Sequence, residues 1–398
     1  MERLYDQLLR DHFADTNKMA FLSGPRQVGK TTTSRRALPD ALYLNWDVSS
    51  HRSLILKGPE AVFEAMGGSV LSEKKRLIIF DEIHKFPRWK NFLKGFFDLY
   101  HATVSVCITG SARLSAFRYG GDSLMGRYFP YRMHPLSVRE IASPSLCKET
   151  RLAPAAIRDG AFRRLLDFGG FPEPFIRADT RFYNRWRRLR LDLLFKEDLR
   201  DLTHISDVAR IRTLADLLAA RSGGLLNYSH LANDLQVSVD TVRRWIDILE
   251  ELYFCFRLRP YSRKIARSLV REPKVYLWDW SLIKDPGTRF ENMVASHLLK
   301  TAHFFTDAGF GTFELHYLRD KQKREVDFAM IRDDEPWFIA EVKQGDTQPS
   351  ESLSYFRVQL DVAHAFQVVL KMPYVNKDCF AARRPVAVPA RTFLSQMV

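Results

Sequence analysis

The sequence of 398 residues contains no long apolar run and no low-complexity stretch or internal repeat. A membrane-spanning helix needs about 20 consecutive apolar residues, and no segment approaches that length. The N-terminal residues, which include Asp6 and Asp11, lack the basic and then apolar layout of a signal peptide. These absences argue against a membrane partner and predict a cytoplasmic protein.

Closely paired cysteines are absent as well. The four cysteines lie far apart, at Cys107, Cys147, Cys255 and Cys379. Zinc sites and disulfide frameworks need thiols at short or regularly paired spacings. We therefore expect neither feature and interpret the four residues as buried thiols.

The composition is that of a globular protein with a strong positive charge. Hydrophobic residues make up 46% and charged residues 27%, and the formal net charge is +14. At roughly 150 residues per domain, the length predicts two or three domains. Basic surfaces attract nucleic acids because they release the counterions of the phosphate backbone. Solubility or an acidic protein partner explains a basic charge equally well, so the charge alone does not identify a DNA-binding protein.

The pattern along the chain divides it into three regions. Residues 1–150 alternate helical stretches with short apolar runs that are typical of buried parallel strands. These runs are Met19–Leu22, Ala41–Asn45, Leu77–Phe80 and Val104–Thr109. Residues 151–262 are helical almost throughout, and residues 263–398 return to mixed structure in the order αβββαβ. The predicted fold class is therefore α/β, with a parallel sheet first, a helical middle and a smaller mixed domain last.

A phosphate-binding loop follows the first apolar run. Residues 24–31 fit G-x-x-x-x-G-K-[ST] between a predicted strand and a helix, which is the context that this motif requires. Glycines let backbone N–H groups surround phosphate oxygens, Lys30 reaches the β and γ phosphates, and the Thr31 hydroxyl can bind Mg²⁺. The predicted nucleotide-binding residues are Gly24, Pro25, Arg26, Gln27, Val28, Gly29, Lys30, Thr31 and Thr32. The motif predicts binding of ATP together with Mg²⁺.

Polar residues also end two other predicted strands. Asp81 and Glu82 follow Leu77–Phe80 at the carboxyl end of a strand, where α/β sheets bind ligands. We expect Asp81 to hold magnesium through water and Glu82 to act as the general base for the attacking water. Thr109 and Ser111 can place hydroxyls beside the γ phosphate, although a Thr-Gly-Ser turn is common in loops.

Together with the segments Leu124–Arg127 and Pro135–Ser137, these motifs resemble the ATPase domain of a large prokaryotic family in the AAA+ group. Proteins of that family carry a further C-terminal domain of unassigned function, and Gly169–Glu173 resembles the motif at the join. The resemblance implies that Arg127 is an arginine finger for the γ phosphate in a neighbouring subunit, and hence a homo-oligomer. It also departs from the AAA+ pattern, because Thr109 or Ser111 must replace the usual sensor asparagine. A solvated or salt-bridged arginine is the alternative role for Arg127.

The middle region resembles a winged helix-turn-helix. Helices are predicted over 208–220, 229–235 and 239–252, with Ser238 as the cap of the third and residues 254–258 as a wing strand. In such a motif the first turns of the third helix face the major groove of DNA. The predicted DNA-binding residues are Thr241, Arg243 and Arg244. Winged helices also serve as packing or protein-contact modules, so this alternative stays open.

The C-terminal region resembles the restriction-endonuclease-like nuclease fold. Asp327 and the Glu-x-Lys pattern of Glu341 and Lys343 lie on neighbouring predicted strands, and Glu291 lies on the preceding helix. By this resemblance Asp327, Glu341 and Glu291 would bind Mg²⁺, and Lys343 would stabilise the attacking water or the developing charge.

Two functions follow from these patterns. The first is an ATP-driven AAA+ protein that engages DNA and whose C-terminal domain can cut it with a divalent metal. The alternative is a nucleotide-switched module for assembly or protein interaction, in which the C-terminal domain is a catalytically silent scaffold.

Overall fold

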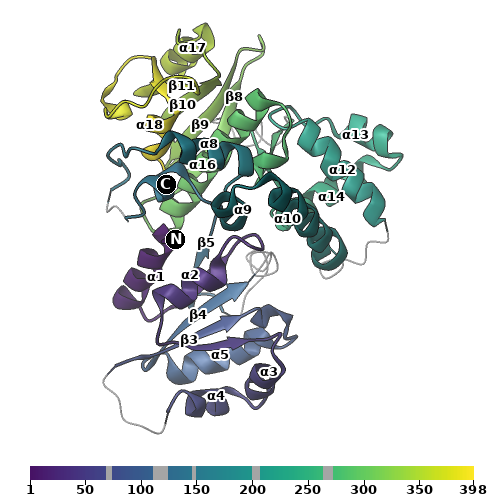
Figure 1. Ribbon diagram of the computed structural model, residues 1–398, viewed down its shortest axis with the longest axis vertical. Helices are drawn as coiled ribbons and strands as arrows, with labels where there is room; N and C mark the ends of the chain where they lie inside the picture. The colour runs from purple at the N-terminus through teal and green to yellow at the C-terminus, as the bar shows by residue number, and fades with distance from the viewer. Residues whose placement is uncertain (69–73, 111–123, 146–148, 200–206, 263–271) are drawn as a thin grey trace. The chain divides into compact units, whose positions relative to one another are not determined.

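The computed structural model describes residues 1–68, 74–110, 124–145, 149–199, 207–262 and 272–398. Ser111 and Cys147 therefore lie outside the described residues. The chain forms two compact units, Met1–His134 and Pro135–Val398, which contain the segments shown in Figure 1. The division into three sequence regions stays a prediction, because the helical middle and the C-terminal sheet belong to one compact unit.

The first unit is built on a parallel sheet of five strands in the order β2-β3-β4-β1-β5. The strands are β1 (Met19–Ser23), β2 (Leu42–Asn45), β3 (Arg76–Asp81), β4 (Val104–Gly110) and β5 (Tyr128–Arg132). The first four confirm the predicted apolar runs. The edge strand β5 was not predicted, because its alternating burial and Pro130 give it no continuous apolar signal.

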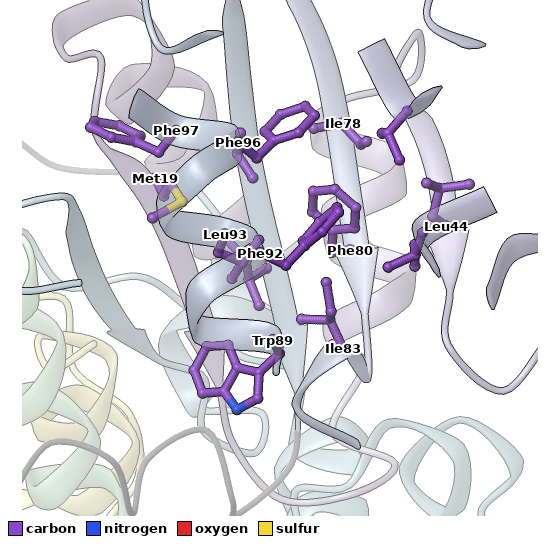
Figure 2. Packing of buried hydrophobic residues seen from close by; sticks show 14 of the residues in the cluster. Met19, Leu44, Ile78, Phe80, Ile83, Trp89, Phe92, Leu93, Phe96 and Phe97 are labelled. Carbon is purple, nitrogen blue, oxygen red and sulfur yellow. The ribbon is translucent and has the colours of Figure 1, made fainter. Parts of the chain in front are cut away.

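Helices cover both faces of this sheet. They are α1 (Leu4–Asp15), α2 (Lys30–Ala37), α3 (Ser49–Leu56), α4 (Pro59–Ala65), the 3₁₀ turn η1 (Ile83–Lys85) and α5 (Trp89–Tyr100). Large apolar residues recur in α5 at three- and four-residue spacing, which gives the helix one buried face. Figure 2 shows Phe92 and Phe96 of this face beside Phe80 of β3, and both rings meet Phe80 edge-on at centroid distances of 5.6 and 5.7 Å. This core holds the carboxyl end of β3, and hence Asp81, in a fixed position.

The second unit begins with helices. They are α7 (Val138–Ala142), α8 (Asp159–Phe168), α9 (Pro172–Arg177), α10 (Thr180–Leu193), the π-helical turn η3 (Leu194–Asp198), α12 (Val208–Ala220), α13 (Tyr228–Leu235) and α14 (Val239–Glu251). The last three match the predicted helices, and the Ser238 side chain accepts the backbone N–H of Thr241 as the predicted cap. An antiparallel hairpin follows, formed by β6 (Cys255–Leu258) and β7 (Lys274–Leu277).

A mixed sheet of five strands in the order β12-β11-β10-β9-β8 completes the second unit. Its elements are η4 (Trp280–Leu282), α16 (Pro286–Asp307), β8 (Phe313–Arg319), β9 (Glu325–Arg332), β10 (Glu335–Lys343), α17 (Glu351–Leu360), β11 (His364–Val369), η5 (Cys379–Ala381), β12 (Val386–Pro389) and α18 (Ala390–Ser395). From α16 to β11 the predicted order αβββαβ is confirmed. The finer assignment to a restriction-endonuclease-like fold stays a prediction.

Other expectations concern apolar segments and thiols. None of the helices in the described ranges combines the length and the apolar character that crossing a bilayer requires. Cys107, Cys255 and Cys379 are buried free thiols, and burial raises the pKa of each one.

Candidate functional site

The loop between β1 and α2 has the backbone conformation that phosphate binding requires. A Cβ on Gly24 would lie 2.3 Å from the carbonyl oxygen of Met133, so only glycine fits there. Gly29 has φ of 103° and caps α2, which aims the first N–H groups of the helix into the loop. The ammonium of Lys30 donates to the carbonyl oxygens of Gly24 and Pro25 at 2.9 and 2.8 Å. The lysine is thereby held over the loop.

Arg3 connects this loop to the end of the first unit. Its guanidinium is buried and donates to the carbonyl oxygen of Val28 at 2.9 Å and to that of His134 at 2.7 Å. Val28 lies within the phosphate loop, and His134 is the last residue of the unit. The sequence analysis did not identify Arg3, because no motif joins residues so far apart in the chain.

The carboxylate of Asp81 lies at the centre of a cluster of hydroxyl groups. It is buried at the end of β3 and accepts hydrogen bonds from Thr31 at 2.9 Å, Thr109 at 2.5 Å and Tyr43 at 2.6 Å. Burial and the hydrogen bond to this carboxylate raise the pKa of Tyr43 to about 12. Over the part of the chain that the structure describes, no basic side chain forms an ion pair with Asp81. A buried carboxylate with neutral donors alone suits a divalent cation, so Thr31 and Asp81 fit the predicted magnesium site.

Glu82 differs from Asp81 in conformation and in electrostatics. Its φ of 56° is unusual for a residue other than glycine, and such backbone strain is common at functional sites. Its carboxylate lies 3.5 Å from His84 and 3.6 Å from Lys85. Burial raises the pKa of Glu82, while the charge of Lys30 opposes that shift. A raised pKa brings a carboxylate closer to the value that suits a general base near neutral pH.

Of the two predicted sensor residues, Thr109 is placed beside Asp81 and Ser111 lies outside the described residues. Tyr43 is a further member of the cluster that the sequence analysis missed. The sequence contained one indication that β2 contributes to the site. The polar Asn45 ends this strand and is in register with Asp81. Its amide donates to the Tyr43 hydroxyl at 3.1 Å.

Arg127 lies at the opposite end of the sheet. It immediately precedes β5, where Tyr128 is in register with Met19, the first residue of β1, whereas the phosphate loop follows the last residue of that strand. Its guanidinium forms a two-pronged ion pair with Asp98 at 2.8 and 3.0 Å. Within one chain Arg127 is therefore not part of the phosphate site.

The first turns of α14 present the predicted DNA-binding side chains. Arg243 and Arg244 are exposed and Thr241 is half-buried, while the opposite face of the helix is buried. Arg243 also lines a cavity of about 510 Å³, to which Arg257 and Arg259 contribute. Arg257 is paired with Asp247 at 2.6 Å, so it is partly neutralised.

In the C-terminal domain, two of the predicted metal ligands surround a lysine. The ammonium of Lys274 on β7 lies 2.6 Å from a Glu325 oxygen, 3.3 Å from Asp327 and 3.9 Å from Glu291. Burial raises the pKa of Glu291 to about 7, and the charge of Asp327 adds to the shift. Burial lowers the pKa of Lys274, but the charges of the three carboxylates outweigh it and the pKa lies above its ordinary value.

The predicted Glu341 and Lys343 form a separate pair. The Lys343 ammonium lies 2.7 Å from one Glu341 oxygen, and the hydroxyl of Ser350 donates to the other. One oxygen of Asp327 accepts the backbone N–H of Val342 at 2.9 Å. Within the described ranges, no three His, Cys, Asp or Glu side chains are grouped so that they could hold a metal ion. Metal binding and DNA cleavage by this domain stay predictions.

The fold and the phosphate site of the first unit define a P-loop ATPase domain of the AAA type. Residues 16–142 match the family model described as an AAA domain. Residues 159–285 match a domain of unknown function, DUF8612, and residues 286–384 match another, DUF4143. The chain therefore contains an AAA domain over residues 16–142 and a DUF4143 domain over residues 286–384.

Relatives with a similar extent are known from bacteria and archaea. The chain is 26% identical over 394 residues to the uncharacterized protein Rv2008c of Mycobacterium tuberculosis, which covers 95% of this chain and 81% of the relative. It is 21% identical over 383 residues to the uncharacterized protein MJ1544 of Methanocaldococcus jannaschii. This match covers 92% of this chain and 83% of the relative. Among solved structures, the Walker-type ATPase PABY2304 of Pyrococcus abyssi aligns with 72% of this chain and 94% of its own, at 14% identity and a TM-score of 0.42.

Proposed function

We propose that the first unit hydrolyses ATP with Mg²⁺ bound at Thr31 and Asp81. The observation that carries this proposal is the buried Asp81 carboxylate, which receives three hydroxyl groups and forms no ion pair among the described side chains. A magnesium ion bound there would neutralise charge on the phosphate oxygens.

The residues of the chain divide the remaining tasks. The loop from Gly24 binds phosphate oxygens with backbone N–H groups, and Lys30 exchanges its carbonyl partners for the β and γ phosphates. Glu82 takes the proton of the attacking water, since burial raises its pKa and its strained backbone fixes its direction. Thr109 positions Asp81 through their short hydrogen bond.

Two substitutions test these roles. Glu82→Gln should bind ATP as the wild type does but hydrolyse it on the order of 100-fold more slowly, because the base is lost and the phosphate loop is intact. Lys30→Ala should lose ATP binding. Glu60→Gln, an exposed change on α4, is the matched control and should keep full turnover. Turnover of Glu82→Gln equal to that of the wild type would refute the role of Glu82.

We propose DNA binding by α14 as a second function. Two exposed arginines on the first turns of this helix support the proposal, and a cavity with further arginines lies next to them.

In the same proposal the chain forms a homo-oligomer, in which Arg127 of one copy serves the phosphate site of another. The support is the position of Arg127 at the amino end of the sheet, away from the phosphate loop of its own chain.

A further inference from the structure

We propose that Lys274 is the permanent cation of the C-terminal acidic cluster, which we define as Glu291, Glu325 and Asp327. Its ammonium takes the place that a divalent metal would occupy among these carboxylates. The domain then folds without a metal and binds none at this cluster. The resemblance to nucleases implied a metal held by Asp327, Glu341 and Glu291. The residues present do not fit that role, because Lys274 lies beside Asp327 and Glu291 and Lys343 pairs with Glu341.

The first argument is the space around the nitrogen. Lys274 begins β7 and its side chain is only 4% exposed, so the ammonium cannot turn out into solvent. An ammonium has three N–H donors, and three carboxylates surround this one at 2.6, 3.3 and 3.9 Å. A magnesium ion would need the same oxygens at about 2.1 Å in an octahedral arrangement. The nitrogen and the metal therefore compete for one position.

The second argument is that the other bonds of the cluster are already made. The Tyr276 hydroxyl donates to Glu291 at 2.8 Å, and Arg319 pairs with the second oxygen of Glu325 at 2.5 Å. The Val342 N–H binds the second oxygen of Asp327. The three carboxylates are half-buried, and each has a protein partner in addition to Lys274 without a metal.

The third argument is the balance of charge. Four carboxyl groups, the acidic cluster and Glu341, face three cations, namely Lys274, Arg319 and Lys343. A divalent ion added to this set of four carboxyl groups and three cations would change its formal charge from −1 to +1 beside the buried Lys274 ammonium, which is costly.

The arrangement also joins two parts of the second unit. Lys274 belongs to the hairpin that follows the helical region, whereas the acidic cluster lies on α16 and β9. The contact thus fixes the hairpin to the C-terminal sheet, as a structural metal would do between two segments.

The test is divalent binding by the full-length chain in the absence of nucleotide. Calorimetry and paramagnetic resonance with Mn²⁺ would be recorded on a chain with Asp81→Asn, which removes the N-terminal metal site. This chain should bind no Mn²⁺ below about 1 mM, the weak end of divalent sites in proteins. Adding Lys274→Met, a neutral side chain of similar length, should create a site that binds at least about tenfold more tightly.

Three further measurements show whether any new Mn²⁺ site is formed by the acidic cluster. Lys284→Met, an exposed lysine nearby in sequence, should create no site. Asp327→Asn added to Lys274→Met should abolish the new site. Mn²⁺ should raise the melting temperature of Lys274→Met and leave that of the Lys274 chain unchanged.

Two results would overturn the proposal. One is Mn²⁺ binding by the Lys274 chain that disappears in Asp327→Asn, and this measurement decides even where Lys274→Met does not fold. The other is a folded Lys274→Met chain, with a cooperative melting transition, that binds no more Mn²⁺ than the Lys284→Met control.

Discussion

The two acidic sites of this chain use the same residue types and differ in where a lysine lies. In the first unit Asp81 is surrounded by hydroxyls, and Lys30 donates to backbone carbonyls of the loop. In the second unit Asp327 lies 3.3 Å from the buried ammonium of Lys274. Asp81 thus has no cationic side chain as an ion-pair partner among the described residues, whereas Asp327 is paired with a lysine of the same chain.

The difference shows that acids and a lysine near a sheet do not by themselves define a metal site. A lysine on a phosphate loop can leave its carbonyl partners for a ligand, because neutral acceptors hold an ammonium weakly. A lysine enclosed by three carboxylates is held by charge, since its removal would leave three half-buried acidic groups close together without their shared cation. The groups that the lysine ammonium contacts therefore distinguish a metal-binding site from a structural ion pair better than the spacing of the acidic residues does.

The difference between the two sites can be removed by a substitution that places a cationic side chain in the first one, and this change has the largest expected effect. Tyr43→Lys would place an ammonium beside Asp81, where the tyrosine hydroxyl now donates. We expect Mg²⁺-dependent ATP hydrolysis to fall on the order of 100- to 1000-fold, as with loss of a key electrostatic group. Steady-state turnover against Mg²⁺ concentration measures the effect.

Tyr43→Phe is the matched control for this change. It removes the same hydrogen bond without adding a charge, and it should keep turnover within a few-fold of the wild type. Equal losses in the two variants would mean that the hydrogen bond, and not the added cation, is responsible.

A second prediction concerns stability in acid and a buried histidine of the second unit. Fully buried His297 receives the Val138 N–H on Nε2, and its Nδ1–H donates to the Met293 carbonyl. Burial lowers its pKa to about 4, below the ordinary value of 6.5, so the unfolded state binds more protons between these values. The contribution of His297 to the free energy of unfolding is therefore fully present above pH 6.5 and is lost as the pH drops toward 4. The loss is about 2 kcal/mol between pH 6.5 and 5.

Thermal unfolding of the wild type and of His297→Gln at a series of pH values would test this linkage. The glutamine variant does not titrate, and its melting temperature should decline less below pH 6.5. Parallel declines in the two proteins would show that another group controls the acid response.

The third prediction sharpens the DNA-binding proposal. Arg243→Ala with Arg244→Ala should weaken binding to duplex DNA and reduce the salt slope by about two, since each lost phosphate contact lowers it by about one. Arg52→Ala with Lys57→Ala removes the same charge from an exposed position of α3 and from the exposed residue that follows the helix, and serves as control. An unchanged slope in the first pair, or an equal loss in the control, would favour the packing role of the winged helix.

The smallest expected effect is partial recovery of activity between two inactive chains. If Arg127 acts on a neighbouring copy, mixing Arg127→Ala with Lys30→Ala brings some intact Arg127 side chains to intact Lys30 sites. Asp98→Ala releases Arg127 from its ion pair without removing it and should stay active. No recovery in mixtures that light scattering shows to be assembled, together with an inactive Asp98→Ala, would identify the ion pair as structural.

Local signals predicted much of the fold. Continuous apolar runs predicted β1 to β4, and Ser238 marked the start of α14 as its cap. The strand and the helix on either side of the phosphate loop were predicted, because the motif lies within eight consecutive residues. The short edge strand β5 gave no signal, since an edge strand needs no apolar run.

Contacts between distant segments could not be predicted from motifs. Lys274 approaches Glu291, Glu325 and Asp327 only because the hairpin packs on α16 and β9. One signal was available, since this lysine begins an otherwise apolar strand that continues with Val275. A lysine in a buried strand needs an anionic partner, and the sequence does not show which one.

Arg3 makes the position of the phosphate loop depend on a residue far from it in the sequence. Its planar guanidinium holds the carbonyl oxygens of Val28 and His134 at a fixed separation, because the donor fork is rigid. Met133 adds a second constraint, since its carbonyl oxygen leaves no room for a side chain on Gly24. These two contacts join the phosphate loop to the residues at which the chain leaves the first unit.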